Sequence, residues 1–182
     1  MSHSRKLALI RGINVGRAKR VAMADLRSLF TDFGYREVRT VLNSGNVVFT
    51  APGETSGEIA PQIERALLMR IDVDARVMVL SAPDVDTLMA ENTLLDRAED
   101  HAKLVVALPF AAGDMAKLQP LAEDDWGDEL LVLGSRAAYL WCADGIADSK
   151  LGKSVMRALK DALTTRNWAT MIKVQQLLAK GE

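Results

Sequence analysis

The first eighty residues alternate between two spacings of apolar side chains, and this alternation restricts the fold more than any other feature. Residues 6–10 form a short apolar run that stops before Arg11 and Gly12, which predicts a buried strand. Residues 22–33 carry apolar side chains at helical spacing, and Gly34 suits the position after a helix. The chain therefore begins with a strand and a one-sided helix.

Two more strands and a second helix extend this pattern. Residues 38–42 and 46–50 are strand-like runs, and the Asn-Ser-Gly segment between them is typical of a hairpin turn. A helical stripe after Ser56 and an apolar run at 75–81 complete a β-α-β-β-α-β order. This order is that of a ferredoxin-like, or split βαβ, unit.

The second half of the chain shows a similar order. Strand-like runs cover 103–110 and the two arms of a hairpin at 129–142, and helical stripes cover 149–163 and 168–178. The last helix stands in the place of a fourth strand. We therefore expect an α+β protein with two ferredoxin-like subdomains, 1–80 and 81–182, the second ending in an extra helix.

Composition excludes several classes of protein. No apolar run approaches the ~20 residues that span a bilayer. The apolar run near the N-terminus is too short for a signal peptide. The single cysteine, Cys142, excludes an internal disulfide and fits a reducing compartment. We expect a cytoplasmic protein that has no membrane partner.

The net charge of −1 hides an uneven distribution of charge. Residues 1–50 hold nine lysines and arginines against three carboxylates, and residues 145–182 hold seven against three. Residues 81–130 hold three against twelve. In one interpretation the basic ends and the acidic middle attract each other or are simply solvated. In the other, the two basic ends come together as one basic face for an anionic ligand.

The glycine-containing loop after the first strand does not match a known phosphate-binding motif. Gly12 and Gly16 are one position too close for a P-loop, and no Lys-Ser or Lys-Thr pair follows them. The dinucleotide fingerprint is also missing. Two interpretations remain: a strand-to-helix connection with solvated charges, or a strand-end arginine, Arg11, that meets an anion beside Asn14.

Three other polar stretches carry the same two interpretations. Ser44 and Asn46 either form a hairpin tip or face a ligand. Lys150 follows Ser149, which can cap a helix, or it offers a cation at that helix N-terminus. The stretch at 164–168 either caps the last helix or presents Arg166 and Asn167 to an anion, with Trp168 stacking on a base.

Metal and nucleophilic sites have little support. Only two histidines are present, His3 and His101, and no G-x-S-x-G turn surrounds a serine. Cys142 lies in an apolar, aromatic strand, which favours an inert core thiol over a nucleophile. We therefore assign no catalytic residue, no metal and no cofactor, and leave open whether the protein is an enzyme.

Residues 8–49 and 144–174, with their RGINVG, NSGN, SKL and TxRNW stretches, resemble a bacterial family known as domain of unknown function 1697. The resemblance implies a compact α+β protein and no established activity. The chain departs from the family at Asn92-Thr93-Leu94, where relatives tend to carry Asn-Pro-Phe.

These observations predict a protein that binds an anionic ligand, namely a nucleotide, a nucleic acid or a phosphorylated metabolite, in a groove between the subdomains. One alternative is an enzyme acting on a small molecule with a phosphate or carboxylate. Another is a hydrogen-bonded seam that joins the two halves without any ligand. The predicted ligand-binding residues are Arg11, Asn14, Ser44, Asn46, Lys150, Arg166, Asn167 and Trp168.

Overall fold

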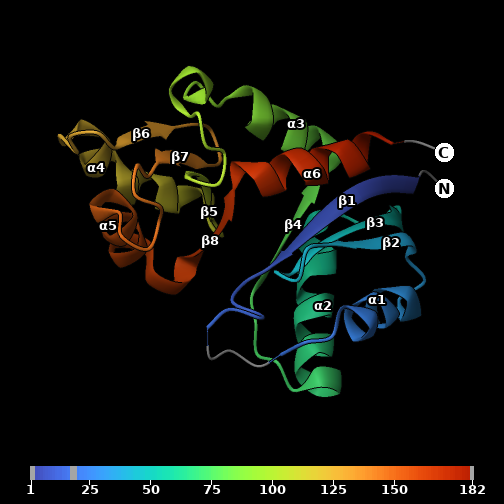
Figure 1. Cartoon of the computed structure of the whole chain (residues 1–182). Coiled ribbons are helices and arrows are strands. Elements are labelled where there is room, and N and C mark those ends of the chain that lie inside the picture. Colours follow the sequence, from blue (N-terminus) through green and yellow to red (C-terminus); the bar gives the residue numbers. More distant parts are fainter. Residues whose placement is uncertain (1–2, 17–19, 181–182) are drawn as a thin grey trace. The chain divides into compact units, whose positions relative to one another are not determined.

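The computed structural model describes residues 3–16 and 20–180, and the chain divides into two compact units (Figure 1). The first unit comprises Met1–Val85 and Lys173–Glu182, and the second comprises Asp86–Ile172. The end of the chain thus groups with its beginning. The division into folding domains at 1–80 and 81–182 stays a prediction.

The first unit contains one antiparallel sheet of order β2-β3-β1-β4. Two helices, α1 and α2, lie on the same face of this sheet (Figure 1). The elements are β1 (His3–Ile10), α1 (Met23–Asp32), β2 (Arg36–Val41), β3 (Asn46–Pro52), α2 (Ser56–Ile71) and β4 (Val77–Ser81).

The core of the first unit lies between the sheet and these helices. Alternate residues of β1 and β3, such as Ile10 and Phe49, point to the helices and are fully buried. Phe30 of α1 packs edge-to-face on Phe49, with ring centroids 5.0 Å apart. The apolar side chains of the predicted strands and those of the predicted helices therefore pack together in one core layer.

The hairpin turn between β2 and β3 is pressed against the end of β1. Gly45 has a φ of 76°, and its carbonyl accepts a 2.8 Å hydrogen bond from the Ile10 N–H. A Cβ at Gly45 would lie 2.8 Å from the Ile10 carbonyl oxygen. Glycine is needed here for its backbone conformation and also for its lack of a side chain.

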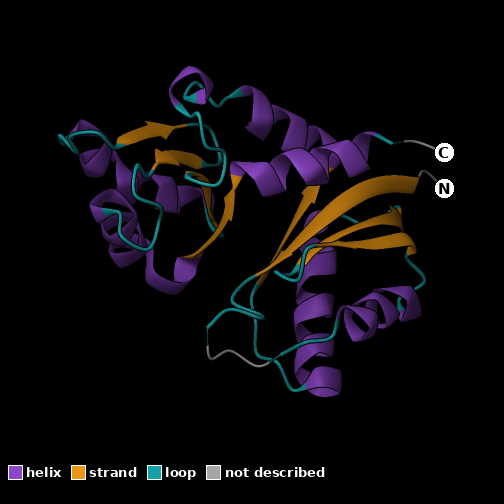
Figure 2. Ribbon diagram, in the orientation of Figure 1, coloured by secondary structure: helices purple, strands orange, loops and turns teal. Residues whose placement is uncertain are grey.

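The second unit repeats this topology in a sheet of order β6-β7-β5-β8, which is also antiparallel (Figure 2). Its helical segments are mostly short. The chain here runs α3 (Ala82–Ala90), η1 (Leu95–Arg97), β5 (Leu104–Pro109), η2 (Ala112–Leu118), α4 (Gln119–Glu123), β6 (Leu130–Leu133), β7 (Ala138–Trp141), α5 (Lys150–Leu159), η3 (Lys160–Ala162), β8 (Leu163–Asn167) and α6 (Trp168–Ala179).

The prediction of a helix in place of the fourth strand was wrong. β8 pairs with β5 and places Arg166 opposite Val106, and α6 follows as an additional element. The two adjacent threonines, Thr164 and Thr165, favour a strand because β-branched side chains fit a pleated surface. The α+β class with two β-α-β-β-α-β units and an extra final helix is confirmed. Among the described helices, none combines the length and apolar character needed to cross a bilayer.

The close approach at Gly45 yields a stability prediction. We expect Gly45→Ala to lower the free energy of unfolding by about 3 kcal/mol, because it adds a steric clash to the strain of a positive φ. Gly34, whose φ is 81° and whose Cβ would meet nothing within 4 Å, provides the control. Gly34→Ala should cost about 1 kcal/mol. Urea denaturation measures both, and equal losses would show that the turn has room for a side chain.

Candidate functional site

The eight predicted ligand-binding residues are divided equally between the two units. Arg11, Asn14, Ser44 and Asn46 lie in the first unit. Lys150, Arg166, Asn167 and Trp168 lie in the second. The predicted groove between the subdomains stays a prediction.

Within the first unit, three segments meet at one end of the sheet. β1 ends where β4 begins, and the backbone N–H of Arg11 donates to the Arg76 carbonyl over 2.9 Å. The guanidinium of Arg20 donates to the Asn14 carbonyl over 3.0 Å. Arg11 is partly buried, whereas Arg20 and Arg76 are exposed. We call these three arginines the basic sheet end. Arg17 and Lys19, also basic, lie outside the described residues.

Asn14 holds the loop of the basic sheet end in shape. Its φ is 56°, a left-handed conformation that asparagine tolerates. Its amide donates to the Val21 carbonyl over 3.0 Å and to the Asn43 carbonyl over 2.9 Å. Its Oδ1 accepts from the Val21 N–H over 2.7 Å. Both amide protons are thus used inside the protein, which makes Asn14 a structural residue of this loop.

Asn46 has a similar role in the hairpin. The side chain is fully buried, and its amide donates to the Val41 carbonyl and to the Ser44 hydroxyl, each over 2.9 Å. These bonds close the turn between β2 and β3. Asn46 presents no surface to a ligand in this structure, and Ser44 is partly exposed beside it.

In the second unit, Asn167 and Trp168 form the junction of β8 and α6. The side-chain Oδ1 of Asn167 accepts from the Thr170 N–H over 2.9 Å and from the Thr170 hydroxyl over 2.7 Å, so Asn167 caps α6. Trp168 is only 3% exposed and meets Tyr139 edge-on, with centroids 6.5 Å apart. The indole is therefore packed inside the protein and offers no face to a base.

Arg166 differs from these asparagines because its charge is held away from water. Its guanidinium donates to the Thr164 hydroxyl over 2.9 Å and to the Thr165 carbonyl over 2.7 Å. Burial lowers the pKa of Arg166 to about 10. A desolvated guanidinium gains stability from any anion that reaches it. The role of Arg166 as a ligand residue stays a prediction.

The start of α5 is already occupied by protein groups. Ser149 Oγ accepts from the Gly152 N–H over 2.7 Å, and Glu129 Oε2 accepts from the Leu151 N–H over 3.0 Å. The Glu129 carboxylate supplies the negative charge that a helix N-terminus attracts. Lys150 is exposed at this end.

Cys142 is buried, and burial raises the pKa of its thiol, which agrees with an inert core residue.

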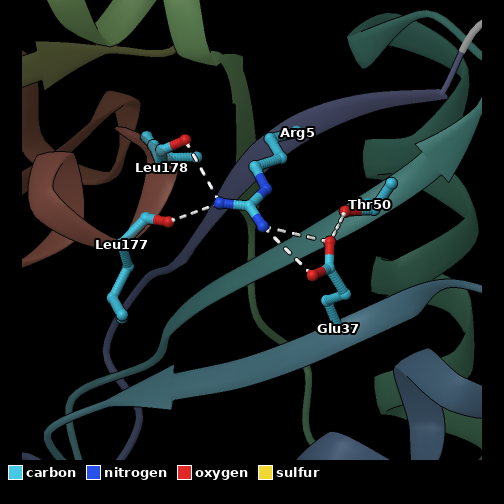
Figure 3. Close-up of polar contacts among 5 residues, drawn as sticks. All are labelled: Arg5, Glu37, Thr50, Leu177 and Leu178. Carbon is cyan, nitrogen blue, oxygen red and sulfur yellow. Dashed lines mark hydrogen bonds and ion pairs between the residues drawn. The ribbon is translucent and has the colours of Figure 1, made fainter. Parts of the chain in front are cut away.

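Sequence reasoning missed a polar network on the other end of β1, shown in Figure 3. The Arg5 guanidinium donates to the carbonyls of Leu177, over 3.0 Å, and Leu178, over 3.4 Å. These carbonyls belong to the last turn of α6, where they have no partner within the helix. The same guanidinium reaches both carboxylate oxygens of Glu37, over 3.1 and 3.2 Å. Arg5 thus joins β1, β2 and the C-terminus of α6.

Glu37 reaches Arg5 through an irregular backbone. The register between β2 and β3 shifts between Arg36 and Arg39, and Glu37 lies in this bulge with a φ of 51°. A left-handed residue other than glycine costs roughly 1 kcal/mol, and bulges redirect side chains. The hydroxyl of Thr50 donates to Glu37 over 2.8 Å. The pKa of Glu37 is held below its usual value, mainly by this hydrogen bond and secondly by the hydrogen bond from Arg5.

A cavity of about 160 Å³ lies beside this network. Its lining is mostly polar and carries three cations against one carboxylate. The lining residues are Arg5, Glu37, Arg39, Val48, Phe49, Thr50, Leu177 and Lys180. One signal in the sequence could have indicated it, since Glu37 is the sole carboxylate between residues 33 and 53. No group of three histidine, cysteine, aspartate or glutamate side chains suited to a metal occurs in residues 3–16 and 20–180.

These observations define an α+β protein built from two antiparallel β-α-β-β-α-β units with clusters of arginine at strand ends. The sequence matches the family described as "Protein of unknown function (DUF1697)" over residues 4–139, and the chain belongs to that family. This confirms the resemblance found in the sequence.

Among solved structures, the chain is similar to the conserved bacterial protein SP0830 from Streptococcus pneumoniae. The two share 24% sequence identity with a TM-score of 0.78, over 97% of this chain and 99% of that one. At this identity the likeness shows the fold alone. No curated protein matches the chain at a significant level.

The cap at Asn167 can be tested by stability measurements. Asn167→Ala should lower the free energy of unfolding by about 1 kcal/mol, because it removes the acceptor of the Thr170 N–H. Thr165→Ala, two positions earlier on the same strand, should change it by less than about 0.5 kcal/mol. Chemical denaturation followed by circular dichroism compares the two. Equal effects would show that Asn167 does not act as a cap.

The contacts of Glu37 yield a pH-dependent prediction. Because its folded pKa lies below the unfolded value of about 4.3, the contacts stabilise the protein above that pH. The stabilisation is lost as the pH falls through the folded pKa. We expect Thr50→Val to raise the pKa of Glu37, as measured by carboxyl NMR titration. Thr40→Val, on strand β2 with Glu37, is the control and should leave the Glu37 pKa unchanged. A Glu37 pKa unaffected by Thr50→Val would contradict the assigned cause.

Proposed function

We propose that the protein binds an anionic ligand, a nucleotide, nucleic acid or phosphorylated metabolite, with Arg166 of the second unit and the arginines of the basic sheet end of the first unit as separate candidate contacts. The observation that carries this proposal is the position of Arg166 on the edge strand β8, where its partly exposed guanidinium donates to the oxygens of Thr164 and Thr165. An approaching phosphate offers the same guanidinium a charged acceptor, and such bonds are roughly twice as strong as neutral ones.

The basic sheet end supports the same function by its charge. Arg11 and Arg76 are joined through their backbones, and Arg20 is held to the same loop by its bond to Asn14. Guanidinium groups bind phosphate and carboxylate through paired, nearly parallel hydrogen bonds. The single buried Cys142 agrees with a reducing compartment, and the proposal places the ligand in the cytoplasm.

A purely structural role for the polar motifs is the second candidate. The side chains of Asn14, Asn46 and Asn167 each form hydrogen bonds within their own unit. Under this alternative, Arg11 and Arg166 also serve the fold, and replacing them lowers the melting temperature without affecting any ligand.

Equilibrium binding with Arg11→Ala and Arg166→Lys separates the two candidates. Arg166→Lys keeps the charge but loses the planar fork of donors. With ATP and a single-stranded oligonucleotide as probes, we expect each variant to bind about tenfold more weakly than wild type. Oligonucleotide binding should also weaken with salt, with a log–log slope of about −0.7 per phosphate contacted.

Exposed arginines on helices provide matched controls for these variants. Arg65→Ala and Arg157→Ala remove the same charge from α2 and α5 and should leave binding within about twofold of wild type. The double variant Arg11→Ala/Arg166→Lys measures whether the two losses add. Absence of binding to both probes at low salt, or melting-temperature losses without a change in binding, would reject the proposal.

A further inference from the structure

The cavity beside Arg5 holds more positive charge than its own carboxylate offsets. Arg5 and Glu37 form a pair with 3.1 Å between nitrogen and oxygen, and their side chains are 20% and 35% exposed. This pair accounts for one cation of the lining. Arg39 and Lys180 remain, both exposed and both lining the same cavity. Two like charges around one space repel each other and attract an anion.

We propose that this cavity is a binding site for a small phosphate group, held by Arg39 and Lys180 above the Arg5–Glu37 pair. The site shares no residue with the proposed function and stands independently of it. Within the described part of the chain, neither the guanidinium of Arg39 nor the ammonium of Lys180 forms a hydrogen bond or a close ion pair, and Arg39 acts on the Glu37 carboxylate through longer-range charge attraction. Both groups are therefore available as charged donors to an incoming oxygen.

The size and lining of the cavity restrict the ligand. About 160 Å³ is close to the volume of a cavity that accommodates a molecule as large as benzene, so the cavity has room for a phosphate group. Arg5 is engaged with Leu177, Leu178 and Glu37, so it fixes the cavity wall (Figure 3). Val48 and Leu177 add an apolar surface, which suits a monoester as well as free phosphate.

The geometry also predicts what binding does to the protein. Arg39 comes from the edge strand β2, whereas Lys180 follows α6, and both belong to the first unit. An anion held by both side chains links the strand to the end of the helix. The last turn of α6, which Arg5 already holds by its carbonyls, then opens less often. Amide hydrogen exchange in that turn should slow when phosphate is bound.

Calorimetric titration of the full chain with inorganic phosphate and with phenyl phosphate, at constant ionic strength, tests the site. We expect binding to wild type and a loss of about tenfold or more in affinity for Arg39→Ala and for Lys180→Ala. Arg36→Ala on β2 and Lys173→Ala on α6 remove equal charges outside the cavity, and both should stay within about twofold of wild type. Preference for phosphate or for its ester identifies which source of the group the cavity favours.

Several results would overturn the site. One is the absence of binding to either probe at millimolar concentration and low salt. Another is an equal loss in all four variants, which would indicate attraction to net charge alone. A third is a Lys180→Ala variant that is less stable but binds phosphate normally, because Lys180 would then serve only the C-terminus of α6. Normal phosphate binding together with failure of the Arg11 and Arg166 tests would leave this site intact and reject only the proposed function.

Discussion

Burial of β1 on both faces is the constraint on which the first unit depends. Four consecutive residues, Leu7, Ala8, Leu9 and Ile10, have no exposed surface, and the strand is paired on both sides. This segment has no room for polar side chains, because each would lose its contact with water. Polar side chains therefore lie before and after these four residues, among them Lys6, which is itself buried. Arg5 stands at one end and Arg11 at the other, and the two candidate anion sites of this unit follow from that placement.

The second unit obeys the same rule in a modified form. Its central strand β5 is buried from Leu104 to Leu108, and the charged residue lies on the neighbouring edge strand. Arg166 is exposed enough to be reached and covered enough to lose part of its hydration. In the second unit, then, the charged residue stands beside the central strand, whereas in the first unit Arg5 lies on β1 itself and Arg11 directly follows it.

Apolar spacing allowed the fold to be predicted, whereas the polar contacts were harder to foresee. The helix at α1 and the hairpin before Asn46 were predicted correctly because each has a local cause: a one-sided stripe and a turn that requires glycine. β8 was missed because its residues are mostly polar and show no apolar alternation. The Arg5 network was missed because Glu37 and Leu177 lie 32 and 172 positions away in the sequence. Asn14 and Asn46 were predicted to bind a ligand, but short amide side chains commonly bond to the nearby backbone.

β8 passes directly into α6, with no loop residue between the strand and the helix. Asn167 is the last residue of the strand and the cap of the helix, and Trp168 is the first residue of the helix. A helix turns by about 100° per residue, so one inserted residue at this junction would rotate every following side chain by that angle. Trp168 would leave its place beside Tyr139, and the buried side of the helix would face water. An insertion at this junction would therefore cost the helix its buried contacts, whereas a change of length in an exposed loop would leave the packed faces in place.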